Sequence, residues 1–309
     1  MFKIKKITGL ILVIFIFIAF SGFTPTMLDK SKTKVTNYPL KVVDAFKRTI
    51  TLNKEPQRII SISPSISQIV FALGKGDKLV GRTDYCDYPA SVKNVASIGG
   101  LVNPNIEKIV ELKPDVVIAS DLINKDIVAK LESLNIKVVI FYGEESFNGV
   151  YDTITKIGNV LNANVKANNT ITSMKYRVSL VVNKVKAAKL KPSVYYVVSY
   201  GKMGDYAATK GTFIGNMIEM AGGVNAANDA TGWKYSVEKL VVKNPDILIC
   251  SKFYGYKDGI KTTPGYMDLK AVKGGKLLEI DNNLLDQQGP RLGEGLQMLA
   301  KLIHPELFK

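Results

Sequence analysis

The stretch NIEKIVELKPDVVIAS at residues 105–120 returns as SVEKLVVKNPDILICS at residues 236–251, and the two copies align without a gap. Each copy begins with a residue type that caps helices, Asn105 or Ser236, and continues with apolar residues at helical spacing. A proline then ends the helical pattern, and a short β-rich apolar run follows. The repeat therefore predicts a helix that leads into a buried strand, once in each half of the chain.

Segments of strand type and helix type alternate on both sides of each copy. Short β-rich runs end in turn residues, and the runs between them carry apolar residues three and four positions apart. After a hairpin at 38–52, the predicted strands include 58–63, 78–83, 116–119, 137–142, 193–200 and 276–280. The predicted helices include 66–74, 106–112, 126–135, 148–162, 211–223 and 291–308. This alternation implies parallel strands joined by crossover helices, so we expect an α/β lobe in each half.

The segment between the halves, residues 165–190, contains neither proline nor glycine and repeats apolar residues at helical spacing. As a single helix it would be about 39 Å long, enough to cross a whole domain. The predicted fold class is therefore α/β, with two Rossmann-like lobes, 38–164 and 191–309, joined by one long α-helix. A stiff helix between lobes allows less relative motion than a flexible linker would.

The N-terminus has the pattern of an export signal. A short cationic segment precedes an apolar run and then small residues, which predicts a signal peptide or an uncleaved anchor at 1–21. Residues 22–37 are polar and are expected to form a flexible tether. Although export permits disulfides, we expect Cys250 to be a small buried residue rather than a partner of Cys86.

Composition and motifs exclude several classes of function. The formal net charge is +15, but lysines are spread along the chain without an aromatic-interleaved patch, so we expect no nucleic-acid partner. The chain lacks a dinucleotide-binding glycine motif, a phosphate loop and a nucleophile elbow. His304 is the single histidine, so neither a Ser-His-Asp set nor a multi-histidine metal site can be assembled. We predict no catalytic residue and no metal site; an enzyme on a doubly wound fold, acting on a small anionic substrate, is the alternative.

Glu107 and Glu238 occupy matching positions at the starts of the two repeated helices. Each is expected to be exposed, because the helix dipole favours an acid there and because Ile106, Ile109 and Val110 are expected to face inward. One acid at the same place on each lobe could bind a two-fold partner that carries basic residues.

The chain resembles ABC-importer solute-binding proteins of the helical-backbone type, also called class III, a group that includes cobalamin-, ferric-siderophore- and haem-binding proteins. The resemblance covers residues 38–309 and is carried, in order, by RIISISPSISQIVFALG, VGRTDYCDYP, GGLVNPNIEKIVELKPDVVI, the long middle helix, YSVEKLVVKNPDILI and GPRLGEGLQMLAKLIHPE. It implies a monomer that binds its ligand between the lobes. It also implies that Glu107 and Glu238 contact arginines of a permease dimer, which works with a separate ATPase.

The resemblance further implies which residues line the cleft. By position in the motifs these are Ser65, Tyr85, Leu101, Asn103, Tyr206, Trp233 and Arg291. Aromatic faces suit a broad chelate, and an arginine could pair with an anionic group on it. The implied ligand is a ferric siderophore or a cobalamin-type corrinoid, less readily haem, so iron or cobalt would arrive with the ligand and the protein needs no cofactor. The sequence does not distinguish a siderophore from a corrinoid, so both ligands stay open at this point.

One position departs from the pattern. Members from Gram-positive bacteria usually carry a lipid-modified cysteine after the signal, and Phe23 stands in its place. We therefore expect a protein on the outer side of the cell membrane or in a periplasm, either released or held by an uncleaved signal.

Overall fold

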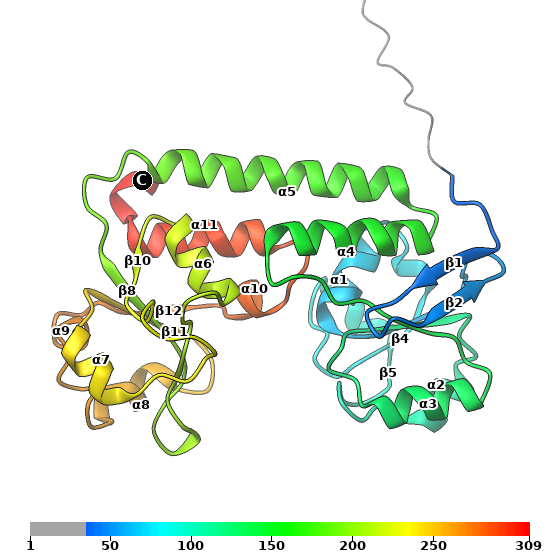
Figure 1. Cartoon of the computed structure of the whole chain (residues 1–309), viewed down its shortest axis with the longest axis horizontal. Coiled ribbons are helices and arrows are strands. Elements are labelled where there is room, and N and C mark those ends of the chain that lie inside the picture. Colours follow the sequence, from blue (N-terminus) through cyan, green and yellow to red (C-terminus); the bar gives the residue numbers. More distant parts are fainter. Residues whose placement is uncertain (1–34) are drawn as a thin grey trace, which may run out of the picture. The chain divides into compact units, whose positions relative to one another are not determined.

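The computed structural model describes residues 35–309 (Figure 1). The predicted export signal, Phe23 and most of the predicted tether lie outside the described residues. Within 35–309, no helix combines the length and apolar character needed to cross a bilayer.

The N-terminal lobe is built on a five-stranded parallel sheet in the order β5-β4-β3-β6-β7. Its strands are β3 (Ile59–Ile62), β4 (Leu79–Arg82), β5 (Ala96–Ser97), β6 (Val116–Ala119) and β7 (Val138–Ile140). Its helices are α1 (Pro64–Ala72), α2 (Ile106–Glu111), α3 (Lys125–Ser133) and α4 (Phe147–Val160). The predicted hairpin is also present, as antiparallel strands β1 (Leu40–Val43) and β2 (Thr49–Leu52).

The C-terminal lobe repeats this arrangement with a parallel sheet in the order β10-β8-β11-β12, to which β9 adds an antiparallel edge. Its strands are β8 (Ser193–Ser199), β9 (Tyr206–Ala207), β10 (Val224–Asn225), β11 (Ile247–Ser251) and β12 (Leu277–Ile280). Its helices are α6 (Phe213–Met220), α7 (Val237–Lys243), α8 (Tyr256–Thr262), α9 (Lys270–Lys273), α10 (Asn283–Asp286) and α11 (Leu292–Ile303). The predicted fold class is confirmed.

The repeated stretch forms the same unit in both lobes. Its helices α2 and α7 lead into β6 and β11, and each of these strands pairs with the first strand of its lobe's sheet, β3 or β8. The Asn105 side chain accepts a hydrogen bond from the Lys108 amide (3.0 Å), and the Ser236 hydroxyl accepts one from the Lys239 amide (3.3 Å). Both predicted caps are therefore present.

The Pro-Asp pair of the repeat also has a structural role. The carboxylate of Asp115 accepts hydrogen bonds from the backbone amides of Gln57 (2.8 Å) and Arg58 (3.0 Å), just before β3. In the same way, Asp246 accepts one from the Ser193 amide (2.8 Å) at the start of β8. Hydrogen bonds from Lys270 and from Ser193 lower the pKa of Asp246 to about 2. Each aspartate thus fixes the start of the strand beside its own.

Removing the caps should cost a measurable part of the stability. We expect Asn105→Ala and Ser236→Ala each to lower the free energy of unfolding by about 1 kcal/mol, because one helix-start amide loses its acceptor in each case. Urea titration followed by circular dichroism measures the effect. Ser91→Ala is the control, because Ser91 is exposed and caps no helix of the described chain. Equal stability of all three variants would contradict the capping role.

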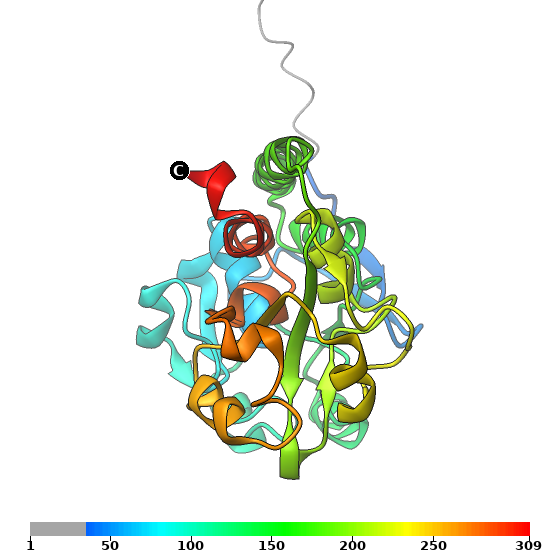
Figure 2. The same ribbon diagram turned by 90° about the vertical axis from the view of Figure 1, so that its left-hand side faces the viewer.

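The connecting helix α5 (Asn164–Val185) has 22 residues and is about 33 Å long. It lies alongside α4 and α11, and the end-on view in Figure 2 shows α5 and α11 as neighbours. The prediction that the helix continues to residue 190 was wrong. Its buried stripe ends at Val185, after which the chain turns with Ala187 donating to the Lys184 carbonyl (3.2 Å), and Leu190 is 80% exposed.

One apolar cluster runs from the N-terminal sheet through α4, α5 and α11 into the C-terminal sheet. Contact between α4 and α5 is close, since a Cβ added at Gly158 would lie 2.6 Å from the Cβ of Ala167. This shared core resists bending along α5, so a change in the distance between the lobes should be small.

Cys250 is buried, as predicted, and Cys86 is buried as well; both thiols are free. The Cys86 sulfur lies 3.2 Å from the Ser67 hydroxyl and 3.3 Å from that of Thr83. Burial raises the pKa of Cys250 to about 12, so its thiol stays protonated and unreactive at neutral pH.

Candidate ligand-binding crevice

A cavity of about 140 Å³ lies between the two lobes, at the carboxyl ends of strands of the N-terminal sheet. The N-terminal lobe lines it with residues that follow β3, β6 and β7 and with residues of α4, and the C-terminal lobe lines it with Asp286, the last residue of α10, and Gln288. Ligands of open parallel sheets bind at this place, beyond the carboxyl ends of the strands. The cavity therefore marks the candidate site between the lobes.

The charged residues that line this cavity, Asp121 and Asp286, are both carboxylates. Burial raises the pKa of Asp121. The Asp286 side chain is exposed, but neighbouring atoms partly desolvate it, which raises its pKa even though Asn282 Nδ2 donates a hydrogen bond to it (2.6 Å). Both side chains are exposed to solvent, and the partial burial that remains disfavours their charged forms.

Tyr142 adds a phenol to the same cavity. Burial raises its pKa, and the nearby carboxylates of Glu145 and Asp121 raise it further. A protonated phenol can donate a hydrogen bond to a ligand.

Three contacts beside the cavity join the lobes directly. Gln68 of α1 donates a hydrogen bond to the side chain of Gln287, and Asn283 Nδ2 donates to Asp87 Oδ2 (2.9 Å). The guanidinium of Arg291 lies over the Tyr88 ring, 4.0 Å from its centroid. These contacts connect the loops of the N-terminal lobe to the segment that leads from β12 into α11.

Arg291 lines a second cavity, of about 330 Å³, together with residues of α1 and the Tyr88 loop. Its Nε donates to Glu294 Oε2 (3.1 Å), so its charge is already paired within the chain. The role of Arg291 in pairing with an anionic ligand stays a prediction.

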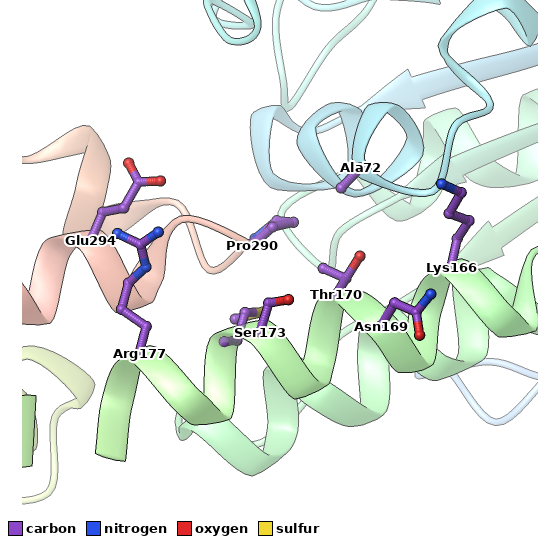
Figure 3. Close-up of a pocket in the computed structure, with 9 residues that line it drawn as sticks. Ala72, Lys166, Asn169, Thr170, Ser173, Arg177, Pro290 and Glu294 are labelled. Atoms are coloured by element: carbon purple, nitrogen blue, oxygen red, sulfur yellow. The ribbon is translucent and has the colours of Figure 1, made fainter. Parts of the chain in front are cut away.

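A third cavity, also about 330 Å³, lies against α5 and is shown in Figure 3. Its polar wall is a row of α5 side chains that runs from Lys166 to Arg177, facing Ala72 and Pro290. It shares Ala72, Pro290 and Glu294 with the Arg291 cavity but does not lie at the strand ends. We therefore do not assign it to the ligand.

The other predicted cleft residues are spread over several loops. Ser65 lines the Asp121–Asp286 cavity, with its hydroxyl 2.8 Å from that of Ser63. Tyr85, Leu101, Asn103, Tyr206 and Trp233 line neither that cavity nor the Arg291 cavity. Tyr85 is 61% exposed, and Trp233 is half-buried in the loop before α7, where its carbonyl accepts from the Ala207 amide (2.7 Å). Ligand contacts by these five residues stay predictions.

Sequence reasoning missed Asp121, Tyr142 and Asp286. Asp121 follows β6, the strand of the first repeat copy, by two residues, and Tyr142 follows β7 by two residues. Their position after buried parallel strands was a usable signal. Nothing local to Asp286 indicated that it would meet the other two.

The helices α2 and α7 expose Glu107 and Glu238, and neither glutamate has an ion-pair partner among the described residues. The prediction that Val110 faces inward was wrong, because Val110 is 42% exposed. Ile109 is fully buried and occupies the inner face of this short helix, leaving Val110 on the side of Glu107. Val241, at the matching position of α7, is 46% exposed.

Comparison with known proteins agrees with this geometry. Residues 59–284 match the family model described as "Periplasmic binding protein". The chain is 34% identical over 291 residues to an uncharacterized ABC transporter substrate-binding lipoprotein, YvrC, of Bacillus subtilis, covering 91% of this chain and 90% of the relative. It is 30% identical over 283 residues to a cobalamin-binding protein of Halobacterium salinarum, with 88% and 76% covered. A crystal structure of a possible iron-binding protein from Staphylococcus epidermidis superposes with a TM-score of 0.72 at 31% identity, covering 81% of this chain and all of the other.

Proposed function

Since the chain belongs to the periplasmic binding protein family, we propose that it captures a cobalt corrinoid of the cobalamin type between its lobes and delivers it to the permease dimer of an ABC importer. A separate ATPase subunit would drive transport. The family, together with the substrate-binding name of the Bacillus relative, confirms a binding protein and contradicts the enzyme considered as the alternative. The proposed place of action is the outer side of the cytoplasmic membrane.

The choice of ligand rests on the charge of the crevice. Asp121 and Asp286 are the charged residues of its cavity, and both would repel the propionates of haem or an anionic ferric siderophore. The rim of a corrinoid carries neutral carboxamides, whose N–H groups can donate hydrogen bonds to carboxylates. The two carboxylates of the cavity thus favour a corrinoid over haem or an anionic siderophore, although the whole chain is basic.

Size sets a second condition. Sites for small organic ligands usually measure about 300–1,000 Å³, so a cavity of about 140 Å³ admits only part of a corrinoid. A small separation of the lobes, with loss of the Gln68–Gln287 and Asp87–Asn283 contacts, would widen this cavity for the ligand. The two relatives described above are named for a cobalamin and for iron, so relatives alone leave both metals open.

A ligand panel tests this proposal. We expect saturable quenching of the single tryptophan, Trp233, by cyanocobalamin and by cobinamide, with calorimetry giving the same affinities. Haem and an anionic catecholate ferric siderophore should bind at least about 100-fold more weakly, because the carboxylates of Asp121 and Asp286 would face their negative charges. Free tryptophan amide controls for light absorption by the ligands. Tighter binding of haem than of cobalamin would overturn the choice, and tightest binding of a neutral or cationic hydroxamate siderophore would retain the charge argument but replace the corrinoid.

A further inference from the structure

We propose that each lobe binds the permease through a glutamate and a valine together, Glu107 with Val110 and Glu238 with Val241. The partner surface would then offer a cation beside an apolar patch, and would offer this combination twice. This inference rests on the proposed function, which supplies a two-fold partner, and adds the apolar half of the contact.

The internal repeat places the same glutamate and the same valine on α2 and on α7. Several positions identical in both copies have contacts within the chain: the aspartates fix strand starts, and Ile118 and Ile249 are buried in the two sheets. The glutamate and valine positions have no such role, because both lie on the exposed side of their helices. Identity at an exposed apolar position, once in each lobe, is not required by the fold.

Helix geometry places each valine next to its glutamate. Residues three apart lie on the same face, so each valine lies beside its glutamate. Valine is also a poorer helix former than the polar residues that usually occupy exposed helix positions. A single exposed apolar residue needs no explanation, but two at matched sites beside matched acids form a repeated surface.

Electrostatics gives the valines a function. An ion pair open to water contributes about 0–1 kcal/mol, too little to hold two proteins together. Apolar contacts that surround a charged pair exclude water and strengthen it. Val110 and Val241 are placed to shield the ion pairs that Glu107 and Glu238 would form.

The test replaces the valines without changing charge. We expect Val110→Asn and Val241→Asn each to reduce cobalamin uptake about 5- to 10-fold, in cells of the native species whose own gene has been replaced. The double variant should reduce it at least about 50-fold. Val242→Asn is the matched control, because Val242 is the next residue of α7, is 84% exposed and points to a different side of the helix. Cobalamin affinity and melting temperature should be unchanged in every variant.

Two outcomes distinguish a failure of the valine contact from a failure of docking by the glutamates. Normal uptake by the double valine variant, alongside lost uptake in the Glu107→Ala/Glu238→Ala variant, would overturn the inference and leave docking by the glutamates intact. Normal uptake in both double variants would overturn docking itself. Val110→Ile/Val241→Ile should retain uptake, and its failure would also contradict a simple apolar contact.

Discussion

Replacing both Glu107 and Glu238 by alanine should abolish cobalamin uptake while leaving the affinity of the isolated protein for cobalamin unchanged. The two glutamates lie at helix starts of the repeated unit, away from the Asp121–Asp286 cavity, and have no ion pair within the described chain. Losing one partner of a shielded interfacial ion pair costs about 2–5 kcal/mol. Each single variant should therefore lose at least about tenfold in uptake, and the double variant at least about 100-fold.

Radiolabelled cobalamin uptake by whole cells and calorimetry on the purified protein measure the two halves of this prediction. Glu111→Ala is a matched control, because Glu111 ends the same helix as Glu107 and has no counterpart acid in the second repeat copy. Substantial uptake by the double variant would show that the permease recognises another surface. A fall in cobalamin affinity would instead show that the glutamates act through the crevice.

The lobes could be predicted because local rules and the fold agree. Buried strands such as β6 and β11 follow a capped helix and a proline, and each of these signals acts within a few residues. The end of α5 could not be predicted so well, because Ala187 and Ala188 are acceptable helix residues and the helix stops only where its buried stripe does. Val110 was misassigned because its apolar character fits an inner face that Ile109 already fills.

The candidate site was harder to predict than the fold. Asp121 and Asp286 are far apart in sequence and line the same cavity only because the fold brings the loop after β6 beside the end of α10 in the other lobe. The net charge of +15 comes from lysines spread along the chain and says little about a crevice lined by two carboxylates. Ligand charge is therefore a local property that composition does not predict.

Replacing these two carboxylates should change ligand selectivity. We expect Asp121→Asn/Asp286→Asn to weaken cobalamin binding about tenfold, because charged acceptors are exchanged for neutral ones, and to strengthen haem binding at least about tenfold, because two like charges are removed. Calorimetry with both ligands measures the change. Asp126→Asn, in the exposed first turn of α3, is the control. Unchanged affinity for both ligands would show that the carboxylates do not face the bound molecule.

The Asp121→Asn/Asp286→Asn variant should be more stable than the wild-type protein at neutral pH. Folding raises the pKa of both aspartates, which means that the folded state disfavours their charged forms. Their contribution to stability is therefore fully present below the ordinary pKa of aspartate and is lost as the pH rises through the raised values. The melting temperature of the Asn variant should exceed that of the wild type at pH 7, and the difference should shrink as the pH falls toward about 4, near the ordinary pKa. A lower melting temperature at pH 7 would mean that the carboxylates stabilise the folded protein. It would contradict the idea that they lower stability and are present because they bind the ligand.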